Sequence, residues 1–282
     1  MVMGDNVLRP TWPILACCLL AGALAAPAAG QSYRESGVSP IFDGWEELPD
    51  GSRMIYFGYI NRQPTEVDIP VGAGNDFEPG AADRGQPTHF LQGRHEHVFT
   101  VKVPRDMTGK VVWTIRTAVG VQTANASFDQ LYILAEHENQ NPNAKPPAVD
   151  VVNLNARVGE PVALTPRITT AANSGRTETE GGVAEAVGLN VAWSKYRGPG
   201  AVVFAAHAST PPVAPSGAGR GRAGRQTAPR QGIHAVNCGL KPTPACGAVM
   251  AMFKEPGVYL LRIAARQDGL EGLGFVQVTV TR

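Results

Sequence analysis

Short runs in which apolar and polar residues alternate recur along the chain, and they predict β-strands. The clearest run is Val258–Ala265, in which Tyr259, Leu261 and Ile263 share one face because strand side chains alternate with a period of two. A Pro-Gly pair directly before this run is a turn signal. No stretch longer than one turn has the period of an amphipathic helix, so we predict an all-β chain.

Apolar runs of strand length occur in both halves of the chain, with turn signals between them. Met54–Ile60 is apolar on both faces, which is typical of a central strand, whereas the polar stretch Val71–Thr88 is predicted to be a long loop. This pattern predicts a β-sandwich in each half. The predicted strands are Met54–Ile60, Glu66–Pro70, Val98–Val103, Val111–Thr117, Val162–Ile168, Leu189–Trp193, Val202–Phe204, Val249–Phe253, Val258–Ala265 and Phe275–Val280.

Segments without apolar periodicity mark the predicted domain boundaries. The Asn- and Pro-rich segment 139–147 is predicted to be a linker between a first domain, residues 31–138, and a second, residues 148–282. A low-complexity insertion, Ser209–Gly232, interrupts the second domain with four Arg and no acidic residue. It holds too few apolar side chains to fold alone, so we predict a flexible loop that folding does not require.

The N-terminus has the pattern of a signal peptide over residues 1–30. The apolar run Trp12–Ala26 is shorter than the roughly 20 residues that a bilayer requires, and small residues suited to cleavage follow it. The mature chain is predicted to begin near Gln31, without a transmembrane segment. Ile14–Cys17 loosely resembles a lipobox, which leaves a lipoprotein as an alternative. We therefore predict export to the periplasm, the cell surface or the medium.

Composition and charge exclude some function classes. Hydrophobic residues make up 43% of the 282 residues and charged residues 17%, which suits a packed core. The 32 Gly and 23 Pro suit turn-rich β structure. Because the net charge is +1, no strong field attracts nucleic acid, and we expect no nucleic-acid partner.

Two cysteines remain after the predicted signal peptide. Cys238 and Cys246 are an even pair in a chain predicted to be exported, so a disulfide that closes a short loop is expected. A redox or metal pair is the weaker alternative, because the spacing matches neither Cys-x-x-Cys nor a zinc pattern.

Two clusters have metal-ligating residue types. The first cluster consists of His89, His95 and His97, whose imidazoles can bind a divalent ion. His95 and His97 are predicted to share a strand face that continues into apolar residues. The second cluster offers oxygen ligands for calcium without the regular spacing of a calcium loop; it consists of Asn75, Asp76, Glu78 and Asp83. Structural roles at the core and in turns explain both clusters better, so we predict neither a metal nor a cofactor.

The polar stretch around Asp83 is a candidate interaction loop. Asp83, Arg84, His89 and Arg94 are its candidate interaction residues, and hydrogen bonds that pin the loop to its own backbone are the favoured alternative. No nucleophile elbow, phosphate-binding loop or dinucleotide fingerprint is present, and no catalytic residue is assigned. A triad assembled from distant positions stays an alternative.

The second half resembles the polycystic-kidney-disease-type (PKD) and related immunoglobulin-like modules of secreted bacterial proteins. Trp193 and Tyr259 are part of that resemblance, and Tyr259 stands where such sandwiches have a corner tyrosine that bonds back to the upstream backbone. The resemblance implies a spacer or binding unit with Trp193 and Tyr259 in its core. It is carried by Val191–Gly200, Val202–Phe204, Phe253–Arg262 and Asp268–Gly269. In the first half, alternation puts Trp113 on one strand face with Val111 and Ile115, so Trp113 is predicted to be a core residue.

The first half resembles a domain found in uncharacterised exported bacterial proteins, which implies export and a β fold. That resemblance is carried by Phe57–Asn61, Ile69–Gly72, Asn75, Asp83–Phe90 and Gly93–Arg94. The leading hypothesis is a non-catalytic structural or interaction protein with a protein or glycan partner. The alternatives are a carbohydrate-binding accessory component of a hydrolytic system and a metal-dependent hydrolase. An enzyme is expected to gather titratable groups of perturbed pKa in a concave pocket.

Overall fold

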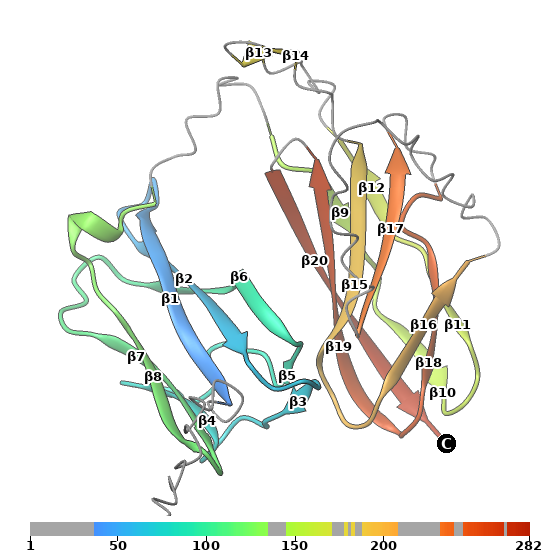
Figure 1. Cartoon of the computed structure of the whole chain (residues 1–282), viewed down its shortest axis with the longest axis horizontal. Coiled ribbons are helices and arrows are strands. Elements are labelled where there is room, and N and C mark those ends of the chain that lie inside the picture. Colours follow the sequence, from blue (N-terminus) through green and yellow to red (C-terminus); the bar gives the residue numbers. More distant parts are fainter. Residues whose placement is uncertain are drawn as a thin grey trace, which may run out of the picture. The chain divides into compact units, whose positions relative to one another are not determined.

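A computed structural model describes residues 37–134, 145–170, 178–179, 182–183, 188–207, 232–239, 245–267 and 270–282 (Figure 1). The predicted signal peptide with Cys17, the first part of the predicted linker and all of the predicted insertion except Gly232 lie outside the described residues. Residues Tyr33–Arg282 form one compact unit. The described part consists of β-strands and one short 3-10 helix, η1 (Gln130–Tyr132), which confirms the all-β prediction.

The first half is a sandwich of two three-stranded sheets around an aromatic core. The strand order is β1-β2-β6 in one sheet and β4-β7-β8 in the other, so the central position predicted for Met54–Ile60 is confirmed. Trp113 and Phe77 stack in the core with ring centroids 5.9 Å apart. The bounds are β1 (Val38–Glu47), β2 (Arg53–Asn61), β3 (Val67–Asp68), β4 (Asn75–Glu78), β5 (His89–Phe90), β6 (Gly93–Val103), β7 (Val111–Thr117) and β8 (Gly120–Ala126).

The second half packs a five-stranded sheet, β10-β20-β19-β15-β17, against a three-stranded sheet, β11-β18-β16 (Figure 1). All pairs within these two sheets are antiparallel except β10 with β20. The bounds are β9 (Ala148–Asp150), β10 (Leu154–Arg157), β11 (Val162–Leu164), β12 (Arg167–Thr169), β13 (Glu178–Thr179), β14 (Gly182–Val183), β15 (Leu189–Arg197), β16 (Val202–Ala206), β17 (Ile233–Gly239), β18 (Val249–Phe253), β19 (Gly257–Gln267) and β20 (Leu270–Thr281).

Two buried aromatic residues organise the core of the second half. Trp193 on β15 is 0% exposed and donates its indole N–H to the carbonyl of Gly247 over 2.7 Å. Tyr259 at the start of β19 is also 0% exposed, and its hydroxyl donates to the carbonyl of Glu255, four residues upstream, over 2.9 Å. This is the tyrosine corner of immunoglobulin-like sandwiches, built by a strand that begins directly after a turn. Trp113, in the other half, is 0% exposed as well.

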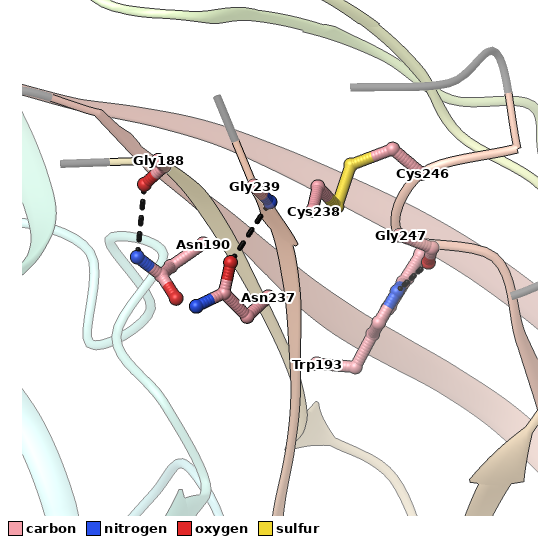
Figure 2. Close-up of a disulfide and its surroundings, with 8 residues drawn as sticks. All are labelled: Gly188, Asn190, Trp193, Asn237, Cys238, Gly239, Cys246 and Gly247. Carbon is pink, nitrogen blue, oxygen red and sulfur yellow. Dashed lines mark hydrogen bonds between the residues drawn. A yellow bond between two sulfur atoms is a disulfide. The ribbon is translucent and has the colours of Figure 1, made fainter. Parts of the chain in front are cut away.

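Cys238 on β17 and Cys246 before β18 form a disulfide, as the sequence predicts (Figure 2). Their Cα atoms are 5.7 Å apart, within the usual range for a disulfide. Figure 2 shows that Gly247, the residue after Cys246, carries the carbonyl that accepts from Trp193. The disulfide therefore holds the segment that completes the hydrogen bonding of the buried indole.

The structure corrects the predicted strands where tertiary contacts override local pattern. The predicted strand Val162–Ile168 is two strands in different sheets: β11 pairs with β18, and β12 pairs with β9. Pro166 lies between them, and a proline cannot donate to a continuous ladder. The predicted loop Val71–Thr88 contains β4, and strand β8 was missed because its sequence, GVQTANA, lacks large apolar residues.

Candidate functional site

Two consecutive residues at the end of β15, Tyr196 and Arg197, contact the candidate interaction loop. The hydroxyl of Tyr196 donates to the carbonyl of Gly85 over 2.5 Å. The backbone carbonyl of Tyr196 accepts from the backbone N–H of Thr88 over 3.1 Å. The guanidinium of Arg197 binds both carboxylate oxygens of Asp83, at 3.0 and 2.8 Å. The hydrogen bond to Arg197 holds the pKa of Asp83 below its usual range. These contacts join β15 to the loop that precedes β5.

A second group at the same junction is the ionic cluster formed by Glu66, Asp68, His89 and Lys195. His89 is 6% exposed, and its ring nitrogens lie 2.8 Å from Asp68 Oδ1 and 2.9 Å from Glu66 Oε2. Lys195 Nζ lies 3.0 Å from Asp68 Oδ1 and donates to the carbonyl of Gly200 over 2.9 Å. The cluster thus links β3 and β5 to β15 and borders a cavity of about 250 Å³.

The surroundings of His89 favour its charged form. Burial by itself lowers the pKa of His89, but the hydrogen bonds to Asp68 and Glu66 outweigh it, so the pKa lies above its usual value. Burial alone raises the pKa of Asp68, but the hydrogen bonds from His89 and Lys195 outweigh burial, so the pKa of Asp68 lies below its usual value. A general base needs a free imidazole lone pair, but carboxylates occupy both nitrogens. The ionic cluster gathers groups of perturbed pKa beside a cavity, as expected of an enzyme, but its geometry fits a structural role because both nitrogens of His89 are engaged.

Arg94 on β6 takes part in a pair of bulges in the sheet β1-β2-β6. The strand register shifts between Phe42 and Gly44 on β1, and again where β2 meets β6. Asp43, whose side chain is 4% exposed, accepts from Arg94 Nη2 over 2.6 Å and from the backbone N–H of His97 over 2.8 Å. A Cβ at Gly58 would collide with this carboxylate, so the position requires glycine.

The bulge on β6 overturns the prediction that His95 and His97 share one face. His97 has a φ of 48°, and among the described residues it is the only one other than glycine with a positive φ. Its ring packs edge-on against Tyr56, with centroids 5.5 Å apart, whereas the ring of His95 lies 5.0 Å from Tyr59. Because Tyr56 and Tyr59 point to opposite faces of β2, the two imidazoles are separated.

Asn75, Asp76 and Asp83, three of the four residues considered for calcium, form internal hydrogen bonds or ion pairs. The side chain of Asn75 is fully buried, donates to the carbonyls of Ile69 and Pro87, and accepts the indole N–H of Trp113 over 2.8 Å. Asp76 pairs with Arg116. Across the described ranges, no group of three or more His, Cys, Asp and Glu side chains is arranged to hold a metal ion.

A cleft of about 1390 Å³ lies between the outer faces of the sheets β1-β2-β6 and β15-β19-β20, and we call it the sheet cleft. One wall contains Tyr56 and His97, and the other contains Leu273 and Phe275. Phe275 is 37% exposed and packs edge-on against Tyr196, with ring centroids 5.0 Å apart. No local sequence pattern indicates this cleft, because its walls come from strands of both halves.

Each of the four candidate interaction residues has an intramolecular partner. Asp83 pairs with Arg197, His89 belongs to the ionic cluster, and Arg94 holds Asp43. Arg84 donates to the carbonyl of Pro79 over 2.5 Å. An interaction of this loop with an external partner stays a prediction.

Comparison with known proteins identifies no family. No family model and no curated protein sequence matches the chain. A chimeric titin Z1Z2–Z1Z2 tandem carrying a fibronectin peptide is 12% identical, with a TM-score of 0.24; the match covers 86% of this chain and 100% of that chain. The D00–D0 domain of intimin is 11% identical, with a TM-score of 0.26, and 87% of this chain and 100% of that chain are covered.

Drosophila N-cadherin EC1–3 is 10% identical, with a TM-score of 0.26, and the match covers 86% of this chain and 89% of that chain. At these scores the likeness supports no argument about function. Among the described residues no helix is long and apolar enough to cross a membrane. The sheets, the tyrosine corner and the disulfide of this chain define its fold.

Proposed function

We propose that the chain is an exported, non-catalytic interaction protein whose ligand occupies the sheet cleft. The observation that carries this proposal is the way in which the cleft wall is built. His97 is held in a left-handed backbone conformation that costs a non-glycine residue of the order of 1 kcal/mol, and its ring lies on the cleft wall. The carboxylate of Asp43, which holds the backbone of His97, is buried at a further cost.

A fold gains no stability from a strained histidine where glycine would fit, so the wall has features that suit binding better than folding. Bulges are common next to functional sites because they redirect a side chain. Export is supported by the disulfide, which forms in oxidising compartments. A metal-dependent hydrolase centred on His89 is less favoured, because carboxylates engage both nitrogens of its ring.

The variant His97→Gly tests this proposal because it separates stability from binding. Glycine relieves the positive φ, so the melting temperature is expected to stay equal or rise, while loss of the ring weakens binding in the cleft. Purified mature protein is screened by calorimetry against short oligosaccharides and extended peptides, and bound ligands are recovered and weighed by mass spectrometry. Binding that is weaker in His97→Gly, with the ligand chemically unchanged, supports the proposal. Turnover of the ligand, or binding only outside the cleft, contradicts it.

A further inference from the structure

Both walls of the sheet cleft carry aromatic pairs. Tyr56 and His97 form an edge-to-face pair on one wall, and Tyr196 and Phe275 form another on the opposite wall. Phe275 and Leu273 are each 37% exposed and line the same wall, so they form one exposed apolar patch in the cleft. Aromatic rings combine an apolar face with fixed geometry, and a face of this kind packs against the C–H face of a sugar ring.

Planar polar groups beside these rings are already fixed in place. The hydroxyl of Tyr56 donates to Glu46 over 2.5 Å. Glu271 accepts from Arg262 Nη2 over 2.7 Å and also pairs with Arg266. A hydroxyl group both donates and accepts, so a sugar can bond to either partner of such a preformed pair. Because the side chains are held before binding, less conformational entropy is lost when the ligand arrives.

The charge of the cleft disfavours anionic ligands. Three carboxylates line it, those of Glu46, Glu96 and Glu271. Arg94 pairs with Glu96, and Arg262 and Arg266 pair with Glu271, so the lining has no excess of positive charge. Nucleic acids, acidic polysaccharides and anionic headgroups would therefore find no net positive charge here to bind them. A peptide that binds by adding a strand would use the edge strand β6, where the bulge around His97 interrupts the regular edge that strand addition needs.

The size of the cleft indicates an oligomeric ligand. Its volume of about 1390 Å³ exceeds the roughly 300–1,000 Å³ of sites for single small molecules. From these observations we propose that the sheet cleft binds a neutral oligosaccharide, with Phe275 and His97 as stacking residues and the pairs at Glu46 and Glu271 as hydroxyl-binding groups. This inference rests on the proposed function and names its ligand class.

The experiment compares three probe classes by calorimetry with purified mature protein. The probes are short neutral oligosaccharides of glucose, xylose and N-acetylglucosamine, acidic oligogalacturonates, and uncharged extended peptides. Phe275→Ala and His97→Gly are expected to weaken binding of the neutral sugar by about ten-fold, the loss of one stacked ring. The matched control is Val203→Ala, because Val203 is exposed on β16 outside the cleft, and it is expected to bind like the wild type.

A neutral ligand also predicts an affinity that does not change between low and high salt, whereas binding to charge weakens as salt rises. Circular dichroism and the melting temperature are measured alongside, and Phe275→Ala and His97→Gly are expected to keep the fold because Phe275 is partly exposed and His97 has a positive φ. Cleft-dependent binding of peptides or oligogalacturonates alone overturns the ligand class but leaves the proposed function standing. If no probe binds in a way that depends on Phe275 or His97, both proposals fail.

Discussion

Replacing His89 by leucine removes the central member of the ionic cluster that joins β3 and β5 to β15. The imidazole is buried between two carboxylates, so the variant takes a charged donor from Glu66 and one from Asp68. Breaking a buried charge pair costs about 3–5 kcal/mol. Asp68 keeps Lys195 and its side chain is 58% exposed, so water compensates part of the loss. We therefore expect the free energy of unfolding to fall by about 3 kcal/mol near pH 6.

The pH dependence of this loss has a defined sign. The pKa of His89 is raised in the folded protein, so its stabilisation is complete below the unfolded pKa of about 6.5 and declines as the pH rises through the folded pKa. The pKa of Asp68 is lowered, so its contribution is present above about pH 4 and disappears as the pH falls through the folded value. The cluster therefore stabilises most between about pH 4 and pH 6.5, and His89→Leu removes the alkaline decline.

Urea unfolding followed by tryptophan fluorescence measures these free energies for the wild type, His89→Leu, Asp68→Asn and the double variant. The double-mutant cycle is expected to give a coupling energy of about 1 kcal/mol or more, because the two side chains are in direct contact. His234→Gln is the matched control: burial lowers the pKa of His234, so this variant should keep the alkaline decline of the wild type. A loss below about 0.5 kcal/mol in His89→Leu, with an unchanged pH profile, refutes the reasoning.

Four further outcomes are expected. Trp193→Ala lowers the free energy of unfolding by about 4 kcal/mol, because it empties a fully buried site; a loss below about 1 kcal/mol in denaturant titration contradicts this. Alkylation without reduction labels neither Cys238 nor Cys246, and replacing both by serine costs about 2–3 kcal/mol; quantitative labelling argues against the disulfide in the mature protein. Asp43→Ala lowers the free energy of unfolding by about 2–3 kcal/mol and weakens ligand binding, because the backbone of His97 on the cleft wall loses its hydrogen bond to Asp43; unchanged binding would show that Asp43 does not support the site. N-terminal sequencing of exported protein starts near Gln31, whereas acylation of a signal-peptide cysteine makes the chain a lipoprotein.

The local pattern of the sequence determined the fold class and parts of the second half. Alternation of apolar and polar residues predicts β19 because a half-buried strand has a period of two, and the turn before it gives Tyr259 its corner position. The predicted export of the chain and the short spacing of Cys238 and Cys246 predict their disulfide. Strands such as β8 carry little apolar signal, so only pairing with β7 decides that they are strands.

Tertiary structure alone decided what the chemistry-bearing residues do. His89 and Lys195 stand far apart in the sequence, and only the folded chain brings them to the same carboxylate. Regular alternation places His95 and His97 on one face, but the bulge adds residues to β6 and separates the two rings. The sheet cleft combines walls from strands at opposite ends of the chain, so no local pattern could predict it. Local sequence determines the period of a strand, whereas the partners of a side chain depend on how distant strands pack.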